Sequence, residues 1–130
     1  MRILGIDPGG TTGFCWIDIV GDGYNVFRSY EERDLWMFPC LSHAIVAMES
    51  CVATGQLTKG KMQQLKAIGA VEYTGVEINW VTPEERSRVK KIPKEVVGDH
   101  ARDACRVAVA FALRKGLFNI DATDSVLTTD

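Results

Sequence analysis

The N-terminal part of the chain alternates short apolar runs with glycine-rich turns. The first apolar run covers residues 2–7, and residues 14–20 and 24–30 are two further runs of β-strand length. Residues 8–13 (PGGTTG) and 21–23 (GDG) separate these runs, and their glycines favour tight turns. The pattern predicts a three-stranded antiparallel meander.

Two helices and two more strands are expected in the middle of the chain. Residues 31–41 predict a helix that bends or ends near Pro39. Residues 44–49 are a continuous apolar run, which is typical of a central parallel strand, and residues 77–81 predict a short fifth strand. Between these two strands, residues 60–73 place apolar side chains at helical spacing.

The second half of the chain contains two helix starts. Residues 82–85 (TPEE) combine a threonine N-cap, a proline in the first turn and a glutamate three residues after the cap. The basic helix that begins there is expected to end at Pro93. Asp99 is expected to cap a last helix over about residues 100–115, with Gly116 after it. Together the elements predict an α/β fold with a five-stranded mixed sheet, in which the antiparallel meander precedes the parallel strands.

Length and composition indicate one domain. The chain has 130 residues, of which 46% are hydrophobic and 25% charged, as in ordinary globular proteins. We expect a domain over residues 1–116 and a polar tail over residues 117–130. No apolar run approaches the roughly 20 residues of a membrane helix, and the first residues resemble a strand rather than a signal peptide. The four cysteines form no C-x-x-C pair, so we expect buried thiols in a cytoplasmic protein that has no membrane contact.

Two acidic residues occupy unusual positions. Asp7 and Glu49 each end an apolar strand, where an unpaired carboxylate loses hydration at a substantial cost in free energy. Functional groups in α/β proteins gather at strand ends, so we expect these two acids to meet. The alternative is that each carboxylate only caps or pairs locally.

The last helix adds two more candidates. His100 and Asp103 are three residues apart and therefore share one face of its first turn. Asp99 either joins the same cluster, in contact with its members, or serves only as the N-cap. Acids that converge at one place repel each other unless a cation is present, and oxygen ligands with one imidazole suit Mg²⁺ or Mn²⁺. Two such ions about 4 Å apart can activate water and stabilise the leaving oxygen in phosphodiester hydrolysis.

Binding to nucleic acid requires a local basic face, because the net charge of the chain is −2. Basic residues gather around the start of the 60–73 helix and in the segment before the last helix. The candidates for phosphate contacts are Lys59, Lys61, Arg86, Arg88, Lys90 and Lys91. The alternative for any one of them is an ordinary solvated helix face.

Three segments together resemble a known family. LGIDPGGTTGFCWID (residues 4–18) resembles the opening of RuvC-type Holliday junction resolvases, where the first strand ends in a metal-binding aspartate before a P-G turn. IVAMES (45–50) resembles the strand that carries their second acid. GDHARDACRVAVAFALRKG (98–116) resembles their last helix, which carries two ligands three residues apart. The segments occur in the same order as in the family.

The resemblance implies an RNase H-like fold and Mg²⁺- or Mn²⁺-dependent cleavage of branched DNA. It also implies a homodimer whose two sites nick opposing strands of a four-way junction. The metal ligands would be Asp7, Glu49, His100 and Asp103, although His100 has an alternative role in orienting or protonating the attacking or leaving oxygen. Lys90 or Lys91 loosely matches the basic residues that follow the fifth strand in the family.

The chain departs from the family pattern in two ways. It is shorter than the cellular enzymes, mainly between the fifth strand and the last helix, which suits a phage- or virus-type relative acting in the host cytosol. The family often has an aromatic residue soon after the second acid, but residues 49–55 (ESCVATG) contain none. A looser cleavage of branched DNA is therefore an open alternative to junction resolution.

Two other interpretations stay open. The segment GIDPGGTTG also resembles the phosphate loop of actin-like ATPases and sugar kinases, but those proteins need two such domains and several hundred residues. A non-catalytic nucleic-acid-binding or processing module like the YqgF group shares the D-P-G opening. The H-x-x-D helix together with Glu49 favours the nuclease, because a pure binder needs no converging ligands.

Overall fold

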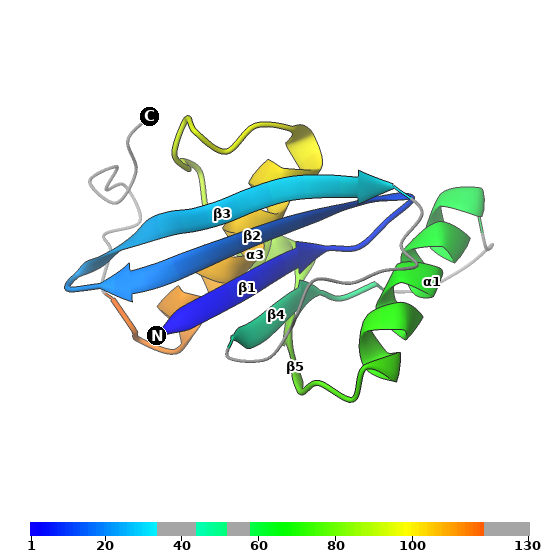
Figure 1. Ribbon diagram of the computed structural model, residues 1–130, viewed down its shortest axis with the longest axis horizontal. Coiled ribbons are helices and arrows are strands. Elements are labelled where there is room, and N and C mark those ends of the chain that lie inside the picture. Colours follow the sequence, from blue (N-terminus) through cyan, green and yellow to red (C-terminus); the bar gives the residue numbers. More distant parts are fainter. Residues whose placement is uncertain (34–43, 52–57, 119–130) are drawn as a thin grey trace.

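Five strands form a mixed sheet in the order β3-β2-β1-β4-β5. The computed structural model, shown in Figure 1, describes residues 1–33, 44–51 and 58–118. The strands are β1 (Arg2–Asp7), β2 (Thr11–Val20), β3 (Gly23–Arg33), β4 (Ile45–Glu49) and β5 (Ile78–Val81). β2 pairs antiparallel with β1 and β3, whereas β4 pairs parallel with β1 and β5. The predicted meander followed by parallel strands is therefore confirmed.

Helix α3 (Asp99–Arg114) packs on one face of the sheet and lies behind it in Figure 1. The helix approaches the strands closely because two strand residues have no side chain. A Cβ atom added at Gly5 of β1 would overlap the backbone of Ala104, and one at Gly13 of β2 would overlap the backbone of His100. This close approach brings the first turn of α3 to the end of β1, where Asp7 lies.

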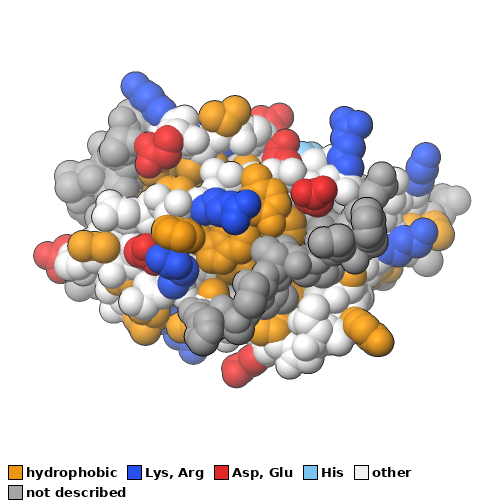
Figure 2. Space-filling model, in the orientation of Figure 1, with side chains coloured by type: hydrophobic (Ala, Val, Ile, Leu, Met, Phe, Trp, Pro, Cys, Tyr) orange, Lys and Arg blue, Asp and Glu red, His pale blue; other side chains and the backbone are white. Residues whose placement is uncertain are grey.

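Helix α1 (Lys59–Tyr73) belongs to the other face. Its buried residues Ala67, Ile68 and Val71 lie on one side of the helix, and the last two join a core with Leu4 and Ile6 of β1. Figure 2 shows hydrophobic side chains in the middle of this face of the sheet, with basic side chains over and beside them. The sheet thus separates two cores, and the α3 side is the one that concerns the candidate site.

The predicted helix over residues 31–41 is wrong at its start. Residues 31–33 continue β3, and Glu31 pairs with Gly13 while Arg33 pairs with Thr11. The long partner strand β2 extends the ladder, and this tertiary pairing outweighs the helical pattern of the local sequence. Residues 34–43 lie outside the described residues.

The predicted basic helix before Pro93 is also much shorter than expected. Helix α2 covers only Pro83–Ser87, although it starts with the predicted capping box at Thr82. Beyond it, the carbonyl oxygen of Val89 accepts a hydrogen bond from Arg106 Nε, and the carbonyls of Pro93 and Val96 accept bonds from Arg102. Arginine side chains of α3 therefore hold the non-helical segment after α2 through its backbone carbonyls.

Asp99 is not the N-cap of the last helix. The N-cap is Gly98, which has a φ of 100° and offers no side-chain cap. The carboxylate of Glu31 takes over this role from β3, because its Oε2 accepts hydrogen bonds from the amides of His100 (2.7 Å) and Ala101 (3.2 Å). A strand thus caps a helix that its own sequence leaves uncapped.

The described core extends slightly beyond residue 116. Phe118 is buried and stacks on Tyr24, with ring centroids 5.8 Å apart. Residues 119–130, most of the predicted polar tail, lie outside the described residues. Cys15 and Cys105 are buried, free thiols, as expected, whereas the free thiol of Cys51 is only partly buried and Cys40 lies outside the described residues. Within the described ranges, no helix has the length and hydrophobicity to cross a membrane.

Candidate functional site

Two carboxylates lie side by side at the C-terminal ends of neighbouring parallel strands. Asp7 is the last residue of β1, and Glu49 is the last residue of β4. The parallel register pairs Gly5 with Ala47, so two residues further along Asp7 comes beside Glu49. Side chains alternate along a strand, which turns both acids toward α3. Their exposed fractions, 9% and 7%, are unusually low for charged residues.

His100 reaches the same place from the first turn of α3. Its Nδ1 atom lies 3.2 Å from Oδ2 of Asp7, within hydrogen-bonding distance. Gly13, the β2 partner of Asp7, is the residue whose missing side chain admits this turn of the helix. Glu31 holds the backbone amide of His100 from the other side. Two residues that are 93 positions apart in the sequence are therefore joined at the sheet end.

Arg86 connects the second strand acid to the second helix acid. Its Nε atom donates to Oε1 of Glu49 over 2.5 Å, and its Nη1 atom donates to Oδ1 of Asp103 over 3.3 Å. Arg106 donates to the same Oδ1 atom over 3.0 Å. The four predicted acidic and imidazole groups thus form a cluster with two arginines, and the guanidinium of Arg86 lies between two of the carboxylates.

The electrostatic environment of Asp7 is unfavourable for its charge. Burial is the largest cause, the hydrogen bond with His100 opposes it, and the negative charges of Glu49 and Asp103 add to it; together they raise the pKa of Asp7 to about 7. No guanidinium pairs with Asp7 among the described residues, in contrast to Glu49 and Asp103. Of the three carboxylates in the cluster, Asp7 is therefore the one whose negative charge has no guanidinium partner among the described residues.

The donor set fits a hard divalent cation. Three carboxylates and one imidazole are the ligand types that Mn²⁺ and Mg²⁺ accept, and two of the carboxylates are nearly buried. The side chains are not arranged around a common point, however, since no three His, Cys, Asp or Glu residues of the described chain are grouped as metal ligands. Arg86 instead lies between Glu49 and Asp103 and contacts one oxygen of each.

Several predicted residues lie outside this cluster. Asp99 is exposed in the first turn of α3, and no hydrogen bond or ion pair links it to the cluster within residues 1–33, 44–51 and 58–118. Lys61 is half-buried on α1. The exposed members of the predicted basic set are Lys59, Arg88, Lys90 and Lys91. Arg86, which was predicted as a phosphate contact, has only 26% of its side chain exposed.

Sequence reasoning did not place two members in the site. Arg106 is three residues after Asp103 on the same helix, so the helical spacing that paired His100 with Asp103 was sufficient to find it. Glu31 had no such signal, because its role depends on β3 reaching the start of α3.

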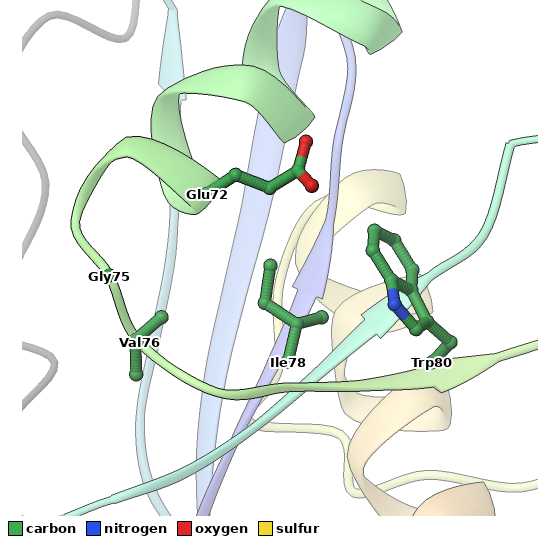
Figure 3. Close-up of a pocket in the computed structure, with 5 residues that line it drawn as sticks. All are labelled: Glu72, Gly75, Val76, Ile78 and Trp80. Carbon is green, nitrogen blue, oxygen red and sulfur yellow. The ribbon is translucent and has the colours of Figure 1, made fainter.

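A hollow lies on the α1 face of the sheet, opposite the face that carries the cluster. It is lined by Glu72, Gly75, Val76, Ile78 and Trp80, at the junction of α1 and β5. In Figure 3 the side chains of Glu72, Ile78 and Trp80 border the same space. Trp80 pairs with Met48, which belongs to the α1-side core, so this hollow is separate from the acidic cluster.

Comparison with known proteins yields matches in structure alone. No family model matches the chain, and no curated protein matches its sequence. A structure of Thermus thermophilus RuvC in complex with Holliday junction substrate superposes with a TM-score of 0.65 at 16% identity, covering 90% of this chain and 97% of that one. A second T. thermophilus RuvC structure gives 0.60 at 18% identity, covering 90% and 98%. The protein therefore has the RuvC-like, RNase H-like fold that its sequence motifs predicted.

Proposed function

We propose that this protein is a metal-dependent endonuclease that cleaves phosphodiester bonds in Holliday junctions or other branched DNA. The observation that carries the proposal is the meeting of Asp7 and Glu49, nearly buried at adjacent strand ends, with His100 and Asp103 on the first turn of α3. The likeness to RuvC over 90% of the chain supports the same interpretation at the level of the fold.

Four side chains would hold the metal: Asp7, Glu49, His100 and Asp103. A bound Mg²⁺ or Mn²⁺ supplies an activated water and stabilises charge on the leaving oxygen. The backbones of Asp7 and Glu49 would be held in fixed positions, because both residues end strands of the central sheet. In the alternative to metal ligation, the half-exposed ring of His100 would orient or protonate the attacking or leaving oxygen.

The DNA would lie along basic side chains of two segments, the one that leads from α2 to α3 and the start of α1. Lys90 and Lys91 follow α2 in the segment that leads to α3, and Arg88 caps the end of α2. Lys59 and Lys61 belong to the first turn of α1. Contacts of this kind bind phosphates without reading the base sequence, which suits recognition of a branched shape.

We also propose that the active form is a homodimer. Two copies related by a two-fold axis would present two sites to a four-way junction, which has approximate two-fold symmetry. Helix α1 offers a surface for this contact, because Met62, Leu65 and Tyr73 are 49%, 39% and 94% exposed along it. Their spacing of three and eleven residues places them along one side of the helix.

A catalytically inactive nucleic-acid-binding module is the second candidate. One observation favours it: Arg86 pairs with both Glu49 and Asp103, which gives these acids a role that requires no metal. Under this alternative the cluster would be a structural ion-pair network, and the protein would bind branched nucleic acid without cutting it.

Incubation with an end-labelled four-way junction separates the two candidates. The nuclease predicts nicks near the branch point in Mg²⁺ or Mn²⁺ and none in chelator, and a linear duplex of the same sequence serves as the control substrate. Binding of the junction without cleavage in either metal would favour the inactive module instead.

A further inference from the structure

Arg86 has an unusual place among the basic residues of the protein. It joins acids from two different elements, Glu49 of β4 and Asp103 of α3, through separate guanidinium nitrogens. Most of its side chain is shielded from solvent, with 26% exposed. The neighbouring basic residues Arg88, Lys90 and Lys91 are exposed by comparison.

The two carboxylate oxygens that Arg86 contacts are ones a metal ion would need. Oε1 of Glu49 and Oδ1 of Asp103 both accept hydrogen bonds from its guanidinium. A guanidinium at hydrogen-bonding distance occupies part of the space around each oxygen, and its positive charge repels a cation that approaches the same oxygen. A divalent ion and Arg86 therefore compete for the same negative charge.

We propose that Arg86 is a resident counter-ion of this site, which holds Glu49 and Asp103 in the metal-free protein and has to withdraw before a divalent cation can bind both. The inference rests on the proposed function in that it takes the cluster to be a metal site. It goes further by proposing that one side chain, Arg86, neutralises the acids when no metal is bound and thereby sets the metal affinity.

The two arginines of the cluster differ in their freedom to move. Arg106 is fixed at a second point, since its Nε atom donates to the carbonyl of Val89. Arg86 has both of its contacts in the cluster and lies on α2, a helix of five residues with no buried residue. Arg86 can therefore swing out on its long side chain without breaking the backbone contacts of the site, whereas Arg106 stays beside Asp103.

The test measures metal affinity without DNA and without turnover. Mn²⁺ binding to the full chain is followed by titration calorimetry for the parent protein, Arg86→Gln, Arg86→Lys and the control Arg114→Gln. Arg114 is a matched control because it also joins α3 to α2 by an ion pair, with Glu85, but outside the cluster. Removal of the competing charge predicts Mn²⁺ affinity at least about tenfold tighter for Arg86→Gln, and no change for Arg114→Gln.

Thermal unfolding gives an independent readout that a purely structural role would not reproduce. In chelator, Arg86→Gln is expected to melt below the parent, because Glu49 and Asp103 then repel each other. With saturating Mn²⁺ the difference should shrink or vanish, since the metal replaces the guanidinium. Arg86→Lys keeps a charge but not the two-pronged geometry, so its Mn²⁺ affinity should fall between those of the parent and Arg86→Gln.

Two results would overturn the inference. Equal or weaker Mn²⁺ binding by Arg86→Gln would mean that Arg86 stays in place or assists the metal, and absence of Mn²⁺ binding by every variant would remove the competition altogether. The proposed nuclease function fails separately: tighter Mn²⁺ binding by Arg86→Gln with no junction cleavage by the parent would retain the counter-ion and reject the enzyme. Cleavage by the parent with unchanged Mn²⁺ affinity in Arg86→Gln would retain the enzyme and reject the counter-ion.

Discussion

Asp7 illustrates how a single residue is placed at the cost of stability. Its carboxylate is nearly buried, lies beside Glu49 and lacks a guanidinium partner in the described part of the chain. A residue selected for stability alone would be neutral at this position. The uncompensated charge is consistent with a carboxylate that binds a cation.

The pH dependence of stability should reveal this charge. The pKa of Asp7 in the metal-free folded protein is about 7, against 3.8 as its ordinary value. Between these two pH values Asp7 keeps its proton in the folded state and has lost it in the unfolded state. The contribution of Asp7 to the free energy of unfolding therefore falls as the pH rises from about 4 to about 7. Above that window, Asp7→Asn should stabilise the metal-free protein by about 1 kcal/mol or more, because one pKa unit corresponds to about 1.4 kcal/mol.

Urea unfolding in chelator at several pH values measures this effect. Asp18→Asn is the matched control, since the Arg2 guanidinium lowers the pKa of this partly exposed carboxylate and the substitution should bring no gain. A parent protein whose stability does not decline between pH 4 and pH 7 relative to Asp7→Asn would contradict the account of this residue.

At the scale of elements, the site depends on how closely α3 approaches the strands. Gly5 and Gly13 remove the side chains that would keep the helix away, and Glu31 caps the helix from β3. These three contacts fix the first turn of α3, and with it His100, relative to Asp7.

Gly13→Ala should therefore damage both the fold and the site. The added methyl group would meet the backbone of His100, which cannot yield as a flexible side chain does, so we expect a loss of about 1–3 kcal/mol in unfolding free energy. Gly69→Ala on α1 is the control, because nothing lies within 4 Å of its added Cβ atom and alanine favours a helix by up to about 1 kcal/mol. Denaturation midpoints of the two variants should move in opposite directions; similar shifts would argue against the tight packing at Gly13.

Elements were predictable from the sequence where the local pattern and the tertiary partner agree. The five strands and the last helix follow from apolar runs and turn residues, and so do the strand ends at Asp7 and Glu49. The extension of β3 over residues 31–33 and the early end of α2 did not follow, because each depends on a distant partner. The link from Arg86 to Glu49 spans 37 residues and has no local signature for the same reason.

At the scale of the whole molecule, the charge is unevenly distributed. The net charge is −2, yet the segment between α2 and α3 carries exposed Arg88, Lys90 and Lys91. An electrostatic binding face of this kind would operate locally, beside the acidic cluster rather than over the whole surface.

Reversal of this basic segment should weaken binding to DNA of every shape. Arg88, Lys90 and Lys91 changed together to Glu should reduce junction and duplex affinity alike, and should lower the salt slope by up to about 0.9 for each phosphate that the protein no longer neutralises. Lys115→Glu is the control, since Lys115 is exposed at the far end of α3 from His100. Titration of labelled DNA at several salt concentrations provides the measurement, and an unchanged slope in the triple variant would exclude the segment from the interface.

The central claim is that acids from separate elements form a metal site that cuts DNA. The most direct test compares cleavage of a four-way junction by the parent and by Asp7→Asn, at DNA concentrations that give both proteins the same occupancy. We predict metal-dependent nicking by the parent, and junction binding without nicking by Asp7→Asn. Equal nicking by the two proteins in the same metal would contradict the claim.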